Sequence, residues 1–397
     1  MIARKPIARS VVFALVLVCQ GVLAAEIGVE LELGIGQTDN ITRTPDTAID
    51  PAIDDTIYTA RFGLDIAHES ARADVDLRSQ LTWLAYQDGP YDSETLPALD
   101  GTAIFRISDE VLSWFARGSV GQQSIDPFRP VTPENRQDVT YLTTGPTVSI
   151  PLGARSALRG DAWYSVVQYD GQPLDNTRTG GQIGFVRQMN PRRSLSLNVR
   201  AEKTEFDEDI LFPEIDRTDA FLGFDTEGAR NEVVVELGFT RVKRLDDETE
   251  EPLATVEWRR QVSPATALTL TGGTQVSDAA DSFRDRQGGS LELGDVQNQQ
   301  NVTAPFREDF AGVSIDYSGT RTSLNFGGRW TQEDYADSVL AGFDRDVQQF
   351  IVNASRRLGG SWMLSGFGSV NRRDYDDLGR QDDDLSIGAS VTWQRPR

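Results

Sequence analysis

Histidine and cysteine are nearly absent from this sequence, which restricts the chemistry that its side chains can perform. The chain of 397 residues contains one histidine, His68, and one cysteine, Cys19. A catalytic histidine pair, a histidine-rich zinc site and a thiol redox centre are therefore excluded. His68 follows an alternating segment and precedes a short turn, where we expect a solvated side chain rather than the base of a serine hydrolase. Since no Gly-x-Ser-x-Gly elbow and no phosphate-binding loop occur, we expect neither an enzyme nor a cofactor.

The chain is acidic, with 61 Asp and Glu residues against 39 Lys and Arg residues and a net charge of −22. This charge repels phosphate groups, so a nucleic-acid partner is not expected. Many acids form short clusters: Asp54-Asp55, Asp207-Glu208-Asp209, Asp246-Asp247-Glu248 with Glu250-Glu251, Asp376-Asp377 and Asp382-Asp383-Asp384. Such carboxylates can bind Ca²⁺, alone or bridging lipopolysaccharide phosphates. None has the spacing of an EF-hand calcium loop, so solvated surface loops are the favoured interpretation and no metal site is assigned.

Eight arginines have a spacing that suggests a transport role. Each occupies the polar phase of an alternating segment, so all would project from the same face of a sheet: Arg61, Arg78, Arg106, Arg117, Arg159, Arg200, Arg259 and Arg329. Guanidinium groups along a channel wall suit an anionic, hydroxyl-rich polymer. Alternatively, they pair across neighbouring strands with acids on the same face. Candidate partners are Glu30, Glu32, Asp65, Asp74, Asp76, Asp161, Glu202 and Glu257.

The segments that carry these arginines alternate between apolar and polar residues with the period of two that is typical of β-strands. The alternation is clearest in residues 27–35, 58–66, 74–83, 195–202, 323–330 and 385–393. No comparable helical period and no run of 18 apolar residues follows residue 24, so a membrane-spanning helix is not expected there.

Short and long polar connections alternate between these segments. Eight short turns are predicted near residues 69–71, 108–110, 151–155, 190–193, 228–230, 263–266, 318–321 and 358–360. Nine longer loops are predicted at residues 37–55, 87–99, 122–138, 170–176, 206–217, 246–252, 278–302, 331–345 and 374–382. These seventeen connections join eighteen strands, and sixteen strands are the alternative.

This pattern is typical of an all-β, transmembrane outer-membrane antiparallel β-barrel with short periplasmic turns and long outer loops. Only 39% of the residues are apolar, as expected when one face of each strand meets lipid and the other meets water. A soluble β-sandwich or propeller also alternates, but neither predicts the regular exchange of short and long connections. Two aromatic girdles are expected, formed by Trp83, Tyr86 and Trp330 near the loops and by Trp114, Trp362 and Trp393 near the turns.

Residues 1–24 are interpreted as a secretory signal peptide, which leaves residues 25–397 as a single barrel. Arg4, Lys5 and Arg9 precede an apolar core at residues 11–19, and small residues lead to a cleavage site after Ala24. A lipoprotein acylated at Cys19 is the alternative, but the residues before Cys19 form a poor lipobox. The expected location is the outer membrane of a Gram-negative cell.

The first alternating segment resembles the opening of a known group of proteins. Leu33-Gly34-Ile35-Gly36, followed by Thr38-Asp39-Asn40-Ile41, is similar to the start of the β-barrel porin 2 family and of the related outer-membrane proteins of PEP-CTERM exopolysaccharide systems. The likeness extends loosely over the chain as strands of similar spacing. It implies an exit channel for exopolysaccharide or capsular polysaccharide that works with a periplasmic polysaccharide export protein. The chain departs from many barrels in that Gln394-Arg395-Pro396-Arg397 follow Trp393, which bears on assembly.

Three functions are compatible with the sequence. The first is polysaccharide export, with the polymer, outer-membrane lipid and lipopolysaccharide as partners. The second is a general or sugar-selective diffusion porin, in which residues 278–302 are numerous enough to fold inward as a constriction. The third is an adhesin or structural barrel that acts through its outer loops.

Overall fold

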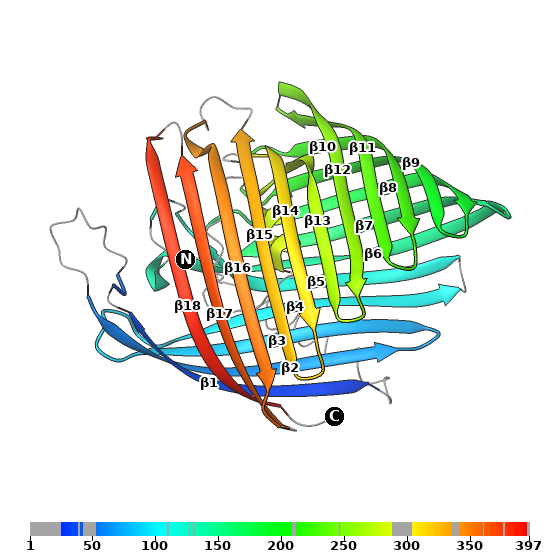
Figure 1. Ribbon diagram of the computed structural model, residues 1–397. Coiled ribbons are helices and arrows are strands. Elements are labelled where there is room, and N and C mark those ends of the chain that lie inside the picture. Colours follow the sequence, from blue (N-terminus) through cyan, green and yellow to red (C-terminus); the bar gives the residue numbers. More distant parts are fainter. Residues whose placement is uncertain are drawn as a thin grey trace.

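The protein forms one antiparallel sheet of eighteen strands that closes on itself (Figure 1). The computed structural model describes residues 25–38, 40–42, 53–108, 111–126, 128–129, 132–208, 212–245, 247–287, 304–335, 341–359, 361–375 and 378–394. Consecutive strands pair with each other, and β1 also pairs with β18. The prediction of an 18-stranded barrel is therefore confirmed, and the alternative of sixteen strands is wrong. The predicted signal peptide lies outside the described residues.

The strands are β1 (Glu26–Thr38), β2 (Asp55–Glu69), β3 (Ala73–Tyr86), β4 (Glu94–Ser108), β5 (Leu112–Ser124), β6 (Arg136–Gly153), β7 (Ser156–Tyr169), β8 (Asn176–Asn190), β9 (Arg193–Phe206), β10 (Ile215–Glu227), β11 (Asn231–Arg244), β12 (Asp247–Ser263), β13 (Thr266–Ser277), β14 (Phe306–Ser318), β15 (Thr322–Tyr335), β16 (Arg345–Arg357), β17 (Trp362–Tyr375) and β18 (Arg380–Gln394). The helical elements are α2 (Ala279–Gln287) and the short 3-10 helices η2 (Pro133–Asn135) and η3 (Ala341–Phe343). No helix among the described residues has the length and apolar character needed to cross a membrane.

The eight predicted short turns all lie between strands, but the predicted long loop at residues 246–252 is wrong. Strand β11 ends at Arg244 and β12 already begins at Asp247. The acids of this stretch continue the hairpin because Arg241 pairs with Glu248 at 3.2 Å and with Glu250 at 3.6 Å across the two strands. These cross-strand ion pairs stabilise Glu248 and Glu250 as part of strand β12.

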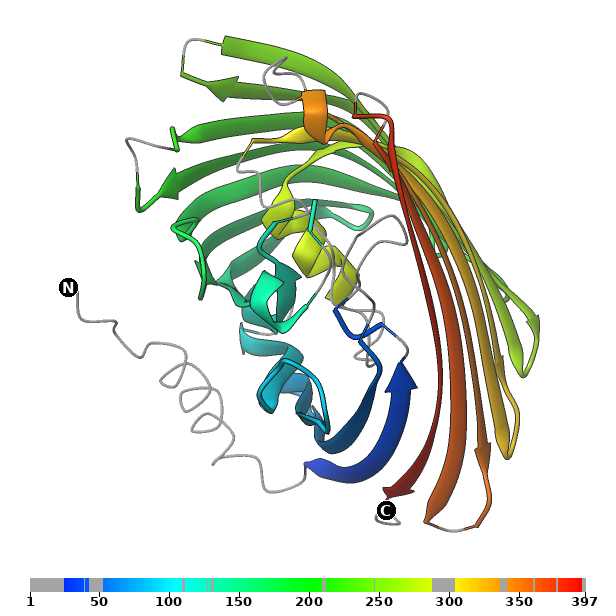
Figure 2. The ribbon, with the colours of Figure 1, turned by 90° about the vertical axis from the view of Figure 1, so that its left-hand side faces the viewer.

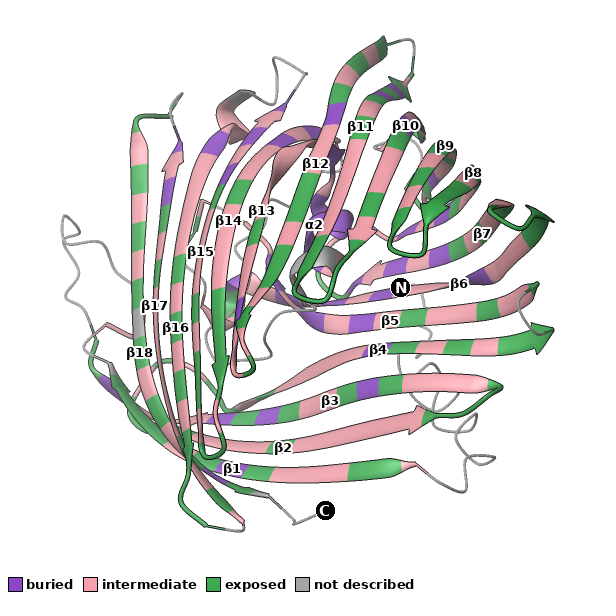
Figure 3. Ribbon diagram, turned by 45° about the vertical axis from the view of Figure 1, so that its right-hand side comes forward, coloured by how far each residue is buried: buried purple, intermediate pink, exposed green. Residues whose placement is uncertain are grey.

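The outward face of the barrel is apolar and exposed, and exposure alternates along the strands (Figure 3). On β1, for example, Leu31 and Leu33 are 46% and 66% exposed while Glu32 between them is buried. The aromatic side chains that are exposed include Trp83, Trp114, Trp330, Trp362 and Trp393. The girdle assignment of Tyr86 is wrong, because its hydroxyl donates a hydrogen bond to the Glu94 carboxylate on the inward face. An exposed apolar surface of this size is expected to face the hydrocarbon of a bilayer and not water.

Two neighbouring residues at the middle of β11 test which face meets lipid. Leu237 points outward and is 55% exposed, whereas Glu236 points into the barrel. We expect Leu237→Arg to lower the free energy of unfolding in lipid vesicles by about 2–4 kcal/mol, because it brings a charge into hydrocarbon. Glu236→Arg is the control and is expected to have a much smaller effect. Equal unfolding free energies for the two variants would contradict a lipid-facing outer surface.

Candidate functional site in the barrel lumen

Helix α2 lies inside the barrel, away from the strands that flank it in sequence (Figure 2). It follows β13 directly, yet it packs against residues of β6 and β7, which are seven and six strands away around the wall. The described part of the loop that was predicted to fold inward therefore does so. The remainder of that loop, from residue 288 to residue 303, lies outside the described residues.

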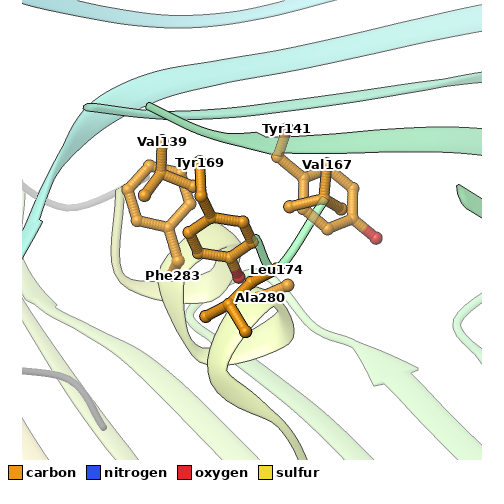
Figure 4. Packing of buried hydrophobic residues seen from close by; sticks show 7 residues of the cluster. All are labelled: Val139, Tyr141, Val167, Tyr169, Leu174, Ala280 and Phe283. Atoms are coloured by element: carbon orange, nitrogen blue, oxygen red, sulfur yellow. The ribbon is translucent and has the colours of Figure 1, made fainter. Parts of the chain in front are cut away.

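An apolar patch on the inner wall receives the helix. Val139 and Tyr141 of β6 and Val167 and Tyr169 of β7 occupy neighbouring inward positions on the wall. Figure 4 shows that the side chains of α2 in this cluster, Ala280 and Phe283, are turned toward these strands. Phe283 is fully buried. Burying a side chain of this size stabilises the docked helix by about 1.5–3 kcal/mol.

Asp278 holds the beginning of α2 and also connects it to the wall. Its Oδ1 accepts hydrogen bonds from the backbone N–H groups of Ala280 and Asp281, each at 2.9 Å, which is an N-cap. The same oxygen accepts a hydrogen bond from Arg178 of β8 at 3.0 Å. One carboxylate therefore both begins the helix and binds it to the barrel.

Arg178 is the central anchor between the helix and the wall. Its side chain is 2% exposed, and besides Asp278 it pairs with Asp281 at 3.2 Å and with Glu202 of β9 at 3.7 Å. Its Nε donates a hydrogen bond to Asn176, and its guanidinium lies over the Tyr141 ring at 5.7 Å from the ring centre. Because the Arg178 side chain is buried, breaking such a pair leaves a buried charge without compensation.

Further arginines surround the same helix and balance its charge. Arg217 approaches Asp281 at 3.6 Å and Asp219 at 3.1 Å, while Arg284 approaches Asp281 at 3.3 Å. Burial alone would raise the pKa of Asp281, but Arg284, Arg178 and Arg217 together lower this pKa to about 2. The Asp281 carboxylate is therefore ionised at neutral pH, and its ion pairs hold the docked helix.

A second contact crosses the lumen toward a different part of the wall. Phe128, in the connection between β5 and β6, packs against Phe343 of η3 at 5.1 Å and Tyr375 of β17 at 5.3 Å between ring centres. The Arg380 guanidinium of β18 lies 5.9 Å from the Phe128 ring centre. This connection and α2 both leave the wall at the loop end, so that end of the lumen is narrowed from two sides.

The predicted arginines lie at inward positions according to the strand register, and five of them form ion pairs. The pairs are Arg61 with Glu32, Arg78 with Asp76, Arg106 with Asp74, Arg200 with Asp219 and Arg329 with Glu308. Arg117 instead lies over the Phe115 ring. Arg159 and Arg259 make no ion pair with any residue that the structure describes. Cross-strand pairing thus accounts for four of the eight arginines, and Arg78 pairs with Asp76 on its own strand β3. A transport role for the set stays a prediction.

Several acids of the predicted clusters bind other groups of the protein. Asp382, Asp383 and Asp384 pair with Arg380, Arg372 and Arg373. Asp55 accepts hydrogen bonds from the backbone N–H groups of Thr56, Gln87 and Asp88. Asp209, Asp246, Asp376 and Asp377 lie outside the described residues. Among the described residues no three side chains of the metal-binding types are grouped as an ion would require.

Comparison with known proteins finds similarity of fold only. No protein-family model matches the sequence, and no curated protein matches it. The FrpB iron transporter from Neisseria meningitidis (F3-3 variant) is 10% identical with a TM-score of 0.44 over 94% of this chain and 69% of FrpB. The BenF-like porin from Pseudomonas fluorescens Pf-5 is 11% identical with a TM-score of 0.44 over 94% of this chain and 99% of the porin. OccK2 (OpdF) of Pseudomonas aeruginosa in complex with glucuronate is 12% identical with a TM-score of 0.43 over 93% of this chain and 97% of OccK2.

Removal of the anchor is expected to release α2 and widen the path through the barrel. We predict that Arg178→Ala raises the single-channel conductance in planar lipid bilayers, since loss of a buried ion pair costs about 3–5 kcal/mol. Arg78→Ala is the matched control, because this inward arginine is 66% exposed and its pair with Asp76 is 3.7 Å long. Conductance that is the same for Arg178→Ala and wild type would show that α2 does not restrict the lumen.

Proposed function

We propose that the protein is an outer-membrane channel through which small hydrophilic solutes diffuse, either generally or with a preference for sugars. The observation that carries this proposal is the opposite character of the two faces of one closed sheet. Apolar side chains such as Leu33 and Ile35 cover the outside, and charged side chains such as Glu32 and Arg61 line the inside. A barrel of eighteen strands is also of a size that can hold an aqueous channel.

Docked α2 favours small solutes over large ones. The helix is held across the lumen by buried apolar contacts and by Arg178, which binds two of its carboxylates. Phe128 and its aromatic partners add a second obstacle at the loop end. In this proposal the two inward connections set the size of solute that passes.

The charge of the inner wall favours cations. At the turn end of β10, β11 and β12, the inward carboxylates are Asp225, Glu227, Glu232, Glu236 and Glu257, and they outnumber the inward Arg259, which lies opposite Glu232. None of these five makes an ion pair within the part of the chain that the structure describes. Unpaired carboxylates that line a pore raise the local concentration of cations and exclude anions. This feature opposes the passage of an anionic polymer that the arginines alone suggested.

Polysaccharide export is the second candidate, and it rests on the resemblance of residues 33–41 and on the anchored helix. A lumen that α2 narrows is compatible with an exit channel that opens only when a periplasmic partner moves the helix. In that case the purified protein would be silent in bilayers. Deletion of the gene would then remove polysaccharide from the cell surface, and unchanged surface polysaccharide would contradict export.

Ion selectivity tests the diffusion channel directly. We expect a steadily open pore in planar bilayers whose reversal potential under a salt gradient shows a preference for cations. The double variant Glu232→Gln/Glu257→Gln is expected to move the reversal potential toward zero, because it removes two lumen charges. The matched control is Glu205→Gln/Glu214→Gln, which removes two exposed acids that bind Lys203 outside the lumen. Preference for anions, or equal shifts in both double variants, would refute this account of the wall.

A further inference from the structure

The seam between the first and last strands is much shorter than any other pairing in the barrel. On β1 only residues 30–33 pair with β18, where they face residues 391–394. The same strand pairs with β2 along its full length, from Glu26 to Thr38. Likewise, β18 pairs with β17 from Arg380 to Trp393. Both strands are thus fully held by their other neighbours, and only the edge that they share lacks a complete ladder.

The unpaired part of the seam lies on the loop side of this short ladder. If the register continued, residues 34–38 of β1 would face residues 386–390 of β18. Instead, β1 and β18 diverge beyond the ladder, as their blue and red ribbons show in Figure 1. Gly36 lies on the inward face of this edge, and a methyl group added there would meet nothing within 4 Å, so the edge is open toward the lumen.

The two sides of this opening differ in chemistry. Toward the bilayer, its edges carry Ile35, Leu385 and Ile387, which are 69%, 69% and 78% exposed. Toward the lumen, the β1 edge carries the small residues Gly34, Gly36 and Thr38, and on the β18 edge the Phe367 ring of β17 lies over Gly388. Backbone N–H and C=O groups without partners are costly in hydrocarbon, so an occupant must supply polar atoms to the edges. It must also present apolar surface to the outward side chains.

We propose that the β1–β18 seam is a lateral opening that admits a phospholipid-like amphiphile of the outer membrane. Its acyl chains contact Ile35, Leu385 and Ile387, and its polar head lies along the Gly34–Gly36 edge of β1 and reaches the lumen. The opening is a wedge that closes at Leu33 and Val391, so it cannot take a complete additional strand from a second copy of the chain. The proposal does not depend on which solute the lumen conducts.

Quenching by lipids with brominated acyl chains tests whether the lumen side of the seam meets the bilayer. The background is the full chain with Cys19→Ser, because Cys19 is the only cysteine of the sequence. A bimane probe is attached to a single cysteine, Gly36→Cys, in phospholipid vesicles. The matched control is Gly327→Cys, an inward glycine on the fully paired strand β15 that also has nothing within 4 Å of its added methyl group. Ile35→Cys gives the signal of an outward position.

We expect bromolipid to quench the Gly36 probe as strongly as the Ile35 probe and to leave the Gly327 probe unaffected. Quenching of Gly36 no greater than that of Gly327 would overturn the proposal, because the seam would then be closed in lipid.

Disulfide formation gives a second test in variants without a probe. The pair Gly34→Cys/Ser390→Cys sits where the ladder would continue, whereas Leu33→Cys/Val391→Cys sits on the existing ladder. We expect the control pair to oxidise faster than the Gly34/Ser390 pair. Equal oxidation rates, or a disulfide between two chains that carry Gly34→Cys alone, would overturn the proposal in favour of a closed seam or of a second copy.

Discussion

Backbone N–H and C=O groups that face hydrocarbon need partners from the chain itself, and this requirement determines most of the structure. Eighteen strands meet it by pairing in sequence order and by joining β1 to β18. A closed wall then separates two surroundings, so alternate side chains of each strand meet lipid or lumen. The alternation of exposed apolar residues with inward charges such as Glu32 and Arg61 follows from closure. The short β1–β18 ladder is the place where this requirement is met least completely.

Inside the barrel, helix α2 is stabilised as in the core of a soluble protein, by burial of apolar side chains and by ion pairs. Phe283 and Ala280 of α2 cover an apolar patch of the wall, and Arg178 pairs with two carboxylates at the beginning of the helix. The lumen is therefore divided into a narrowed loop end and a turn end whose carboxylates on β10 to β12 stay unpaired among the described residues. Size restriction and charge preference, in the function that we propose, come from these two different regions.

The sequence predicted the barrel well because strand alternation is a local signal. The period of two in residues 27–35 or 385–393, together with short turns, was enough to count the strands correctly. The site was predicted only in part. The inward position of residues 278–287 follows from loop length, but the role of Arg178 depends on Asp278 and Asp281, which are 100 and 103 residues further along the chain. Likewise, residues 247–252 were predicted as a loop and not as strand, because the pairing of Glu248 and Glu250 with Arg241 on the neighbouring strand is not visible in the sequence.

The docking of α2 on the opposite wall is the central claim, and a cross-link in native outer membranes tests it most directly. Val139 of β6 and Phe283 of α2 belong to one buried cluster. With Val139→Cys and Phe283→Cys in a Cys19→Ser background, a short bifunctional thiol reagent should join the two residues. The added change Arg178→Ala should reduce the yield. Two thiols that both stay free and react separately with maleimide would contradict a helix docked across the lumen.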